Sequence, residues 1–162
     1  MKRYIALLLL TSLTVLGVYV YQRQSGYPDI SSVEFTLLDG RHINVQQLRG
    51  KPILVSFWAT TCASCLQEIP DLIRLYDKHS PQGLEIIAVA MPYDRPDHVL
   101  EMARARKLPY PVALDIDARI ARAFGNVRVT PHHFLIDTDG SIIKHQIGII
   151  DIPATEQLLQ TL

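Results

Sequence analysis

Apolar residues along the chain form two kinds of stretch: nearly continuous runs, typical of buried strands, and runs with a helical period. Residues 53–59 and 84–91 are of the first kind, as in strands of a parallel sheet that is covered on both faces. The segment between them has helical spacing, with apolar side chains at Leu66, Ile69, Leu72, Ile73 and Tyr76. A strand, a helix and a second strand in this order predict an α/β fold built on a central sheet.

The remaining predicted elements are shorter. Asp39-Gly40 and Asp139-Gly140 each separate two short apolar stretches and predict hairpins over residues 34–46 and 134–144. Helical spacing and capping residues predict three more helices, and a short apolar run predicts one more strand. These are helices at residues 96–107 (with Asp94 as a cap), 117–125 and 154–160, and a strand at 112–114.

The first 21 residues have the pattern of an export signal. Met1-Lys2-Arg3 precedes an apolar stretch from Ile5 to Tyr21 that contains no charged residue. Such a segment keeps the N-terminus in the cytoplasm and leads the rest of the chain across the membrane. Because bulky residues end the stretch, an uncleaved anchor is favoured over a cleaved signal peptide, and a buried core helix is the third interpretation.

This pattern divides the chain into a signal anchor or transmembrane segment (1–21), a polar tether (22–32) and one folded domain (33–162). We therefore expect a protein of the inner membrane whose folded domain lies in the periplasm. The 16 Lys and Arg residues balance 16 Asp and Glu residues and are scattered, so nothing favours nucleic acid as a partner. We expect a monomer that contacts the membrane through its N-terminal anchor.

The chain has only two cysteines, Cys62 and Cys65, and they follow the strand predicted at residues 53–59. Thiols at this spacing lie one helical turn apart at a strand-to-helix junction, where Thr60 and Thr61 offer hydroxyl caps. Free backbone N–H groups and the helix dipole favour a thiolate at the first cysteine. We therefore expect a reversible dithiol, with Cys62 as the exposed nucleophile and Cys65 as the thiol that resolves a mixed disulfide. No cofactor is expected beyond this redox-active disulfide, and no metal.

Two other roles remain open for the cysteine pair. Half of a zinc site would need two more ligands, and the six histidines include no pair with His-x3-5-His spacing. A purely structural disulfide would close a very short loop and would restrict the unfolded chain little. Redox chemistry is therefore favoured over both.

Several motifs together resemble a known family. They are Ser56-Phe57-Trp58-Ala59-Thr60-Thr61-Cys62-Ala63-Ser64-Cys65, then Glu68-Ile69-Pro70, and then Val129-Thr130-Pro131 running into Phe134-Leu135-Ile136-Asp137. From about Val33 onward, the chain resembles membrane-anchored thioredoxin-fold proteins of the TlpA/ResA type. The resemblance implies thiol-disulfide exchange and a thioredoxin-like fold, with a central mixed sheet flanked by helices, an N-terminal β-hairpin and a central αβ insertion.

The same resemblance assigns further site residues. Pro131 matches the family's cis proline beside the two sulfur atoms, and Thr130 would present its backbone to a substrate peptide. Trp58 matches an aromatic residue that packs against the dithiol. The expected substrate contacts are completed by residues next to the cysteines: Thr61, Ala63 and Ser64.

Two positions bear on proton transfer. Ser56 stands where thioredoxin itself has a buried aspartate, so the usual proton acceptor for the buried thiol is missing. Glu68 matches a glutamate near the dithiol of ResA-like proteins and is a candidate general base toward Cys65. The alternative is that Glu68 only complements the positive end of the helix.

His132 and His133 follow Pro131 directly, and strand alternation predicts one ring inward and one outward. A strand histidine with a satisfied ring is the favoured interpretation. The alternatives are a protonated histidine that stabilises the Cys62 thiolate, or a histidine that binds Cu(I) together with both thiolates.

The expected function is reduction of disulfides in exported proteins. Ala63 and Ser64 carry no positive charge, so the thiolate is stabilised only modestly and a reducing role is favoured. A reductase in an oxidising compartment needs a membrane electron donor. The family resemblance makes cytochrome c apoprotein one candidate substrate, although residues 125–131 lack the glutamate-bearing stretch of dedicated cytochrome maturation proteins. A general or copper-protein client is equally open.

Two alternative functions are a copper-handling dithiol protein and a peroxiredoxin-like antioxidant enzyme. Copper chaperones of this fold generally use Cys-x3-Cys, which is one residue longer than the spacing here. The peroxidatic Thr-x2-Cys motif would require threonine where this chain has Ala59. Thiol-disulfide exchange is therefore favoured over both.

Overall fold

The computed structural model describes residues 28–162, and its centre is a sheet with the strand order β5-β4-β3-β6-β7. β3 (Ile53–Trp58) lies in the middle, parallel to β4 (Glu85–Ala90) and antiparallel to β6 (His132–Ile136). β5 (Val112–Leu114) pairs parallel with β4, and β7 (Ile142–Ile147) pairs antiparallel with β6. This mixed sheet confirms the predicted thioredoxin-like α/β fold.

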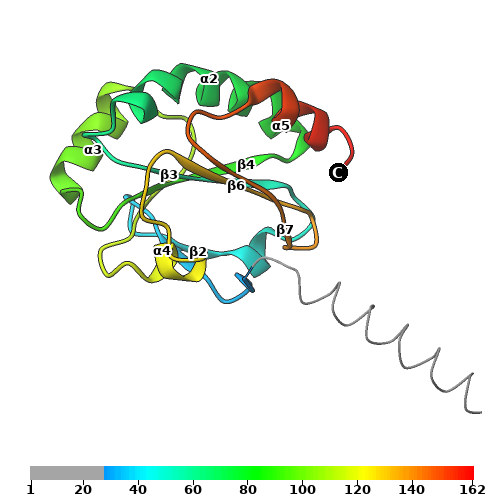
Figure 1. Ribbon diagram of the computed structural model, residues 1–162, viewed down its shortest axis with the longest axis horizontal. Coiled ribbons are helices and arrows are strands. Elements are labelled where there is room, and N and C mark those ends of the chain that lie inside the picture. Colours follow the sequence, from blue (N-terminus) through cyan, green and yellow to red (C-terminus); the bar gives the residue numbers. More distant parts are fainter. Residues whose placement is uncertain (1–27) are drawn as a thin grey trace, which may run out of the picture.

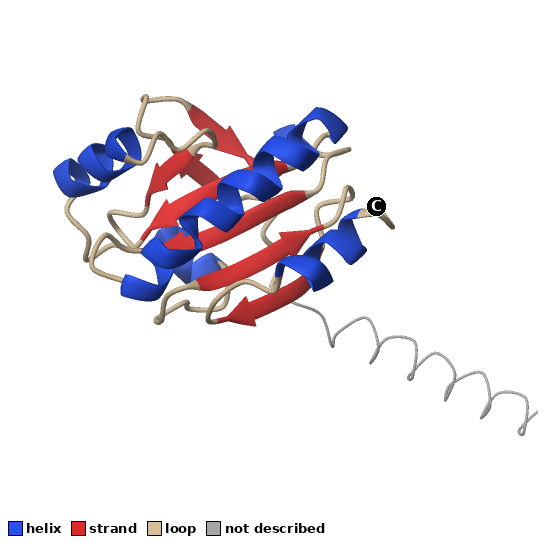
Figure 2. Cartoon of the chain, turned by 90° about the horizontal axis from the view of Figure 1, so that it is seen from above, coloured by secondary structure: helices blue, strands red, loops and turns tan. Residues whose placement is uncertain are grey.

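Helices and a small second sheet cover the two faces of the central sheet (Figures 1 and 2). α2 (Ala63–His79), α3 (Pro96–Ala105) and α5 (Ile152–Leu159) lie on one face, which we call the dithiol face. The other face carries the remaining helix and the predicted N-terminal hairpin, and we call it the aromatic face. Its elements are α4 (Arg119–Ala123) and the antiparallel pair β1 (Glu34–Thr36) and β2 (His42–Asn44).

Burial on both faces explains the continuous apolar run of β3. All six of its side chains are buried, because each face of the sheet is covered. Ile53, Val55 and Phe57 pack in the core of the aromatic face. Leu54 and Trp58 pack in the core of the dithiol face.

The first hairpin ends earlier than predicted. Val45–Leu48 forms a turn of 3-10 helix, η1, and not the end of a strand. The Asn44 side chain accepts a hydrogen bond from the Gln47 N–H, and the Gln47 side chain accepts one from the Asn44 N–H. This reciprocal capping box starts a helical turn where the apolar alternation indicated a strand. A second 3-10 turn, η2 (Ser80–Gln82), follows α2.

The predicted cap of α3 is wrong. Asp94 does not cap α3, whose N-cap Arg95 makes no side-chain capping bond. In front of α4, the buried Asp115 carboxylate accepts hydrogen bonds from the N–H groups of Ile120 and Ala121, at 2.9 and 2.8 Å. Two amides of the first turn of α4 are thus bound by Asp115, and the Arg119 N–H donates to the Asp117 carboxylate at 3.2 Å.

The predicted anchor, residues 1–21, lies outside the described residues. Ile30 is 2% exposed and packs in the core of the aromatic face. The tether predicted over residues 22–32 therefore ends before Ile30, because a buried isoleucine belongs to the folded domain. Within residues 28–162, no helix has both the length and the apolar character that crossing a membrane requires.

Candidate active site

The two cysteines lie where β3 leads into α2. β3 ends at Trp58, and α2 begins at Ala63 with Cys62 as its N-cap. Cys62 and Cys65 form a disulfide. Cys65 is 1% exposed, whereas Cys62 is only partly buried. The structure therefore makes the first sulfur the accessible one and the second the enclosed one.

Cys62 itself caps α2, so the predicted hydroxyl caps at Thr60 and Thr61 are wrong. The Cys62 Sγ accepts a hydrogen bond from the Cys65 N–H, with 3.2 Å between nitrogen and sulfur. The Ser64 hydroxyl lies 3.5 Å from the same sulfur and donates to it, because a disulfide sulfur has no proton to give. These donors and the start of the helix favour negative charge at Cys62 once the disulfide is reduced.

Thr60 has a different role, which the sequence did not indicate. The Asp94 carboxylate accepts hydrogen bonds from the Thr60 N–H at 2.5 Å and from the Thr60 hydroxyl at 2.6 Å. Asp94 lies in the loop after β4, and Thr60 lies two residues before Cys62. This carboxylate thus fastens the loop that carries the nucleophile to the neighbouring strand connection.

The Thr130–Pro131 bond is cis, as predicted. His132 pairs with Phe57 in the sheet, so Pro131 lies at the level of Trp58, where the cysteine loop leaves β3. Pro131 is buried and Thr130 is half-buried. Within residues 28–162, no hydrogen bond uses the Thr130 amide or carbonyl, so both are available to a peptide laid beside them.

A small cavity connects the inner side of the disulfide with Glu68. Its volume is about 10 Å³, at the lower limit for one water molecule. Its walls come from α2, the sheet and the loop before β5, and include Ser56, Trp58, Cys65, Glu68 and Tyr110. Burial raises the pKa of Tyr110 well above its usual range, and the negative charge of Glu68 raises it further. The phenol therefore stays protonated and adds no charge to this space.

Glu68 is 2% exposed and points into the core. Its Oε2 accepts a hydrogen bond from the Ile150 N–H at 3.2 Å, and its Oε1 lies 3.3 Å from His133 Nε2. Neither contact is with the first turn of α2, which contains no acidic residue. The interpretation of Glu68 as a helix-end charge is therefore wrong, and its role as a general base remains a proposal.

The two histidines of β6 are both buried, contrary to the expectation of one inward and one outward ring. His133 faces Glu68 on the dithiol face, while His132 stacks on Phe134 on the aromatic face, with 4.5 Å between ring centroids. Burial lowers the pKa of His132 to about 4, and the charges of His145 and His133 add to the shift. Alternation holds, but both sides of this strand are interior.

The surroundings of the cysteines also bear on metal binding. Within residues 28–162, no group of three or more His, Cys, Asp or Glu side chains could hold a metal ion. The structure therefore gives no support to a copper site built from both thiolates and a histidine.

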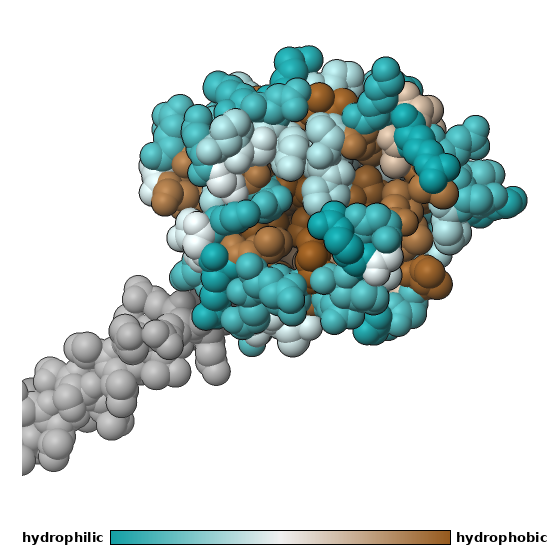
Figure 3. Space-filling model, turned by 180° about the vertical axis from the view of Figure 1, so that it is seen from behind, coloured by the Kyte–Doolittle hydropathy of each residue, from teal (hydrophilic) through white to brown (hydrophobic). Residues whose placement is uncertain are grey.

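Exposed apolar side chains gather at the edge of the sheet that carries the disulfide. Polar residues cover much of the face shown in Figure 3, with apolar residues gathered near its middle. Among the described residues, six large apolar side chains are exposed, and five of them lie next to the strand ends at the edge where β3 leads to Cys62. We call these five the apolar rim: Tyr93, Ile116, Val129, Ile147 and Ile149.

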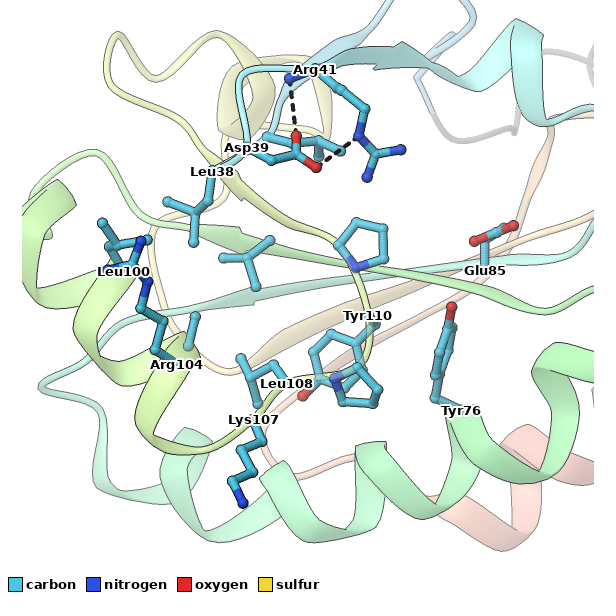
Figure 4. A pocket seen from close by; sticks show the side chains of 15 residues that line it. Leu38, Asp39, Arg41, Tyr76, Glu85, Leu100, Arg104, Lys107, Leu108 and Tyr110 are labelled. Atoms are coloured by element: carbon cyan, nitrogen blue, oxygen red, sulfur yellow. Dashed lines mark hydrogen bonds and ion pairs between the residues drawn. The ribbon is translucent and has the colours of Figure 1, made fainter.

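A larger groove lies away from the cysteines. It measures about 590 Å³ and runs along the edge of β5 between the first hairpin, α2 and α3 (Figure 4). Asp39, paired with Arg41, lines it with Arg104 and Lys107, and neither cysteine does. Tyr110 borders both this groove and the cavity next to Cys65, so the phenol forms part of the wall between them.

The fold and this site define a thioredoxin-fold protein with a Cys-x-x-Cys disulfide at the start of a helix. The family model described as Redoxin matches residues 24–159, and the chain belongs to this family. The resemblance to ResA-type proteins is likewise confirmed by the relatives described next.

Thiol-disulfide oxidoreductase ResA of Bacillus thuringiensis is 37% identical over 114 residues, which make up 70% of this chain and 64% of that protein. The chain thus spans less than two thirds of this relative's length. ResA of Geobacillus thermodenitrificans is 30% identical over 166 residues, covering 100% of this chain and 94% of the relative. A thiol:disulfide interchange protein from Chlorobium tepidum, 23% identical, shares the fold with a TM-score of 0.74 over 84% of this chain and 95% of that one.

Proposed function

We propose that this protein is a thiol-disulfide oxidoreductase that reduces disulfides in exported proteins. The observation that carries the proposal is the partly exposed Cys62 at the start of α2, bonded to the buried Cys65, with the cis Pro131 at the strand end from which the cysteine loop leaves. The relatives named thiol-disulfide oxidoreductase support the same chemistry.

The reaction proceeds by two exchanges. The Cys62 thiolate of the reduced protein attacks one sulfur of a substrate disulfide, and the other substrate sulfur leaves as a thiolate. Cys65 then loses its proton and attacks the Cys62 sulfur, which releases the second substrate thiolate and closes the Cys62–Cys65 disulfide. Glu68 is the group proposed to take the Cys65 proton, because both residues line one enclosed cavity.

The surroundings of Cys62 favour a reductant over an oxidant. Two neutral donors and the start of α2 stabilise its thiolate, and no cationic side chain stands between the cysteines. A helix terminus contributes about 0.3–1 kcal/mol, or up to about 2 kcal/mol in favourable geometry. Strong oxidants of this chemistry need a far more stabilised reduced form.

The substrates are proposed to be proteins, because the site is flanked by exposed apolar surface. The apolar rim surrounds the strand ends from which Cys62 is presented, and the free Thr130 backbone offers a short extended contact. Such a surface fits many partners loosely, since its contacts are main-chain bonds and undirected apolar packing.

The place of action is proposed from the N-terminal sequence. A basic start followed by an uncharged apolar stretch suits an inner-membrane anchor with the folded domain in the periplasm. There the dithiol would be restored by a membrane electron donor, because the compartment itself is oxidising. Cytochrome c apoprotein is one candidate among the exported clients.

The reduction potential tests the proposed direction. The full-length protein in detergent is equilibrated with glutathione or dithiothreitol buffers, and the disulfide state is followed by Trp58 fluorescence, with Cys65→Ala as a control without the transition. A potential near or below about −230 mV supports a reductase, whereas one near about −120 mV contradicts it and indicates an oxidant. Loss of the transition on adding copper would contradict the exchange function and favour copper handling.

A further inference from the structure

Glu68 and His133 form a buried acid-base contact, and the exchange steps described above give no role to the histidine. Glu68 Oε1 lies 3.3 Å from His133 Nε2, and the two side chains are 1% and 3% exposed. No hydrogen bond within the described residues reaches either ring nitrogen of His133. The ring therefore has both nitrogens available and a carboxylate at ion-pair distance, in an interior where unpartnered polar groups are costly.

The position of His133 in the sheet places the Glu68–His133 pair next to the cavity that Cys65 lines. His133 is the cross-strand partner of Ser56, and Ser56 lines the cavity that Cys65 and Glu68 share. A second cavity, also of about 10 Å³, lies on the other side of the pair. It is lined by His133 together with Lys144 and Gln146 of β7, which are only partly buried.

The two cavities and the pair form a continuous series from the buried thiol toward the surface. The first cavity joins Cys65 to Glu68, the contact joins Glu68 to His133, and the second cavity joins His133 to β7. Each cavity is at the lower limit for one water molecule. Polar side chains thus lie along this series, although apolar side chains such as Leu72 and Ile150 form part of the cavity walls.

We propose that His133 is a positioning residue for the second exchange: it fixes the Glu68 carboxylate toward Cys65 and provides the next site for the proton that Glu68 accepts. This inference rests on the proposed exchange function. In the step, the Cys65 S–H bond breaks, and the proton bonds to Glu68 Oε1 or, after transfer, to His133 Nε2. The electron pair left on Cys65 forms the bond to Cys62, and the substrate sulfur leaves with the pair of the broken disulfide.

Other titratable groups lie next to this path. Tyr110 approaches Glu68 from the loop before β5 and stays protonated, and Lys144 of β7 borders the second cavity. His132, paired with His145, faces the opposite side of β6. His132 therefore serves as the matched control, since it is the adjacent histidine on the same strand without access to Glu68.

A two-phase exchange measurement tests the inference on the full-length reduced protein in detergent. Reaction with 5,5′-dithiobis(2-nitrobenzoate) releases one coloured thiolate when Cys62 attacks and a second when Cys65 resolves the mixed disulfide. His133→Gln keeps a donor at the site but takes up no proton. We expect it to slow the second phase about tenfold at neutral pH and leave the first unchanged. The difference should vanish at a pH above the ordinary thiol pKa of about 8.5, where solvent removes the proton.

Further variants distinguish a failure of this inference from a failure of the proposed exchange function. His132→Gln should leave both phases unchanged, and Glu68→Gln with His133→Gln should be no slower than Glu68→Gln alone, because the two residues act in series. A second phase of wild-type rate and pH profile in His133→Gln overturns the inference, as does equal slowing of both phases. If the wild-type protein shows no second phase at all, the proposed function fails instead.

Discussion

The two faces of the central sheet are equally buried but are filled in different ways. On the aromatic face, all four phenylalanines of the chain meet around Phe124, with ring centroids 5.0 to 6.4 Å from it. On the dithiol face, the core next to α2 contains a carboxylate, an imidazole and two small cavities. The aromatic face is thus filled by a ring cluster, whereas the dithiol face gives up some packing and holds ionisable groups near a buried sulfur.

The strongest test of this difference between the two faces is to replace the cysteines. Such changes should affect the rate of disulfide exchange far more than the stability of the fold. Cys62→Ser should abolish disulfide reduction, since the accessible nucleophile is gone. Cys65→Ala should retain the first attack and accumulate a covalent complex, because nothing resolves it. Mass spectrometry under non-reducing conditions should detect this complex with a disulfide-bonded protein substrate.

The corresponding control is urea unfolding of both variants under reducing conditions. With the disulfide reduced in the wild-type protein, each variant differs from it only by the loss or exchange of one sulfur atom, so their stability should stay close to that of the reduced wild-type protein. If Cys65→Ala turned over substrate at the wild-type rate without a trapped complex, resolution by Cys65 would be disproved.

Substitutions on the aromatic face should instead lower stability and leave the exchange rate nearly unchanged. Phe124→Ala removes the ring that contacts Phe35, Phe57 and Phe134, and should lower the free energy of unfolding by about 3–5 kcal/mol. Exchange rates of the folded fraction should change little, because no ring of this cluster borders the cavity next to Cys65. Urea denaturation and the two-phase exchange measurement together check both expectations.

A milder variant protects that test against complete unfolding. Phe124→Leu should lose about 1–2 kcal/mol and remain folded. A large loss of exchange rate in this folded variant would show that the two faces are not independent.

Sequence alone predicted the parts of the molecule that local patterns determine. The strands at β3 and β4 follow from apolar runs, because covered strands leave no polar side, and the Cys62–Cys65 pair follows from its spacing. The cis Pro131 was expected only from the family resemblance. Contacts between distant segments were missed. Nothing local shows that Glu68 meets Ile150, 82 residues away, since such a contact exists only once the sheet has assembled.

Asp94 is the clearest example of a residue whose role the sequence did not predict. A cap for α3 was the local interpretation, because an acid before Pro96 fits that pattern. Its carboxylate instead binds Thr60, 34 residues earlier, since the ends of the parallel strands β3 and β4 bring their loops together. A position of this kind could be recognised only from strand order.

Asp94→Asn should produce the next largest effect on the dithiol face. It replaces two charge-assisted hydrogen bonds to Thr60 with weaker ones, and should lower stability by about 1–3 kcal/mol. Hydrogen exchange of the Thr60 amide should accelerate by more than the global loss of stability explains, because the cysteine loop opens locally.

Asp97→Asn is the matched control, because Asp97 pairs with Arg95 at the surface, 2.6 Å apart, and exposed pairs contribute at most about 1 kcal/mol. Equal effects of the two substitutions would mean that Asp94 is only another surface charge and does not fasten the loop.

The smallest expected effect is a dependence of stability on pH that comes from the buried His132. Burial holds the pKa of His132 at about 4, below its ordinary 6.5, so between these values the unfolded chain binds a proton that the folded protein does not. Stability should therefore fall as the pH drops from 6.5 toward 4, by about 1–2 kcal/mol from this residue. His132→Phe should remove that component, so the free energy difference between variant and wild type should grow in favour of the variant at lower pH. Parallel curves for His132→Phe and wild type would mean that the aromatic face admits charge as readily as the dithiol face.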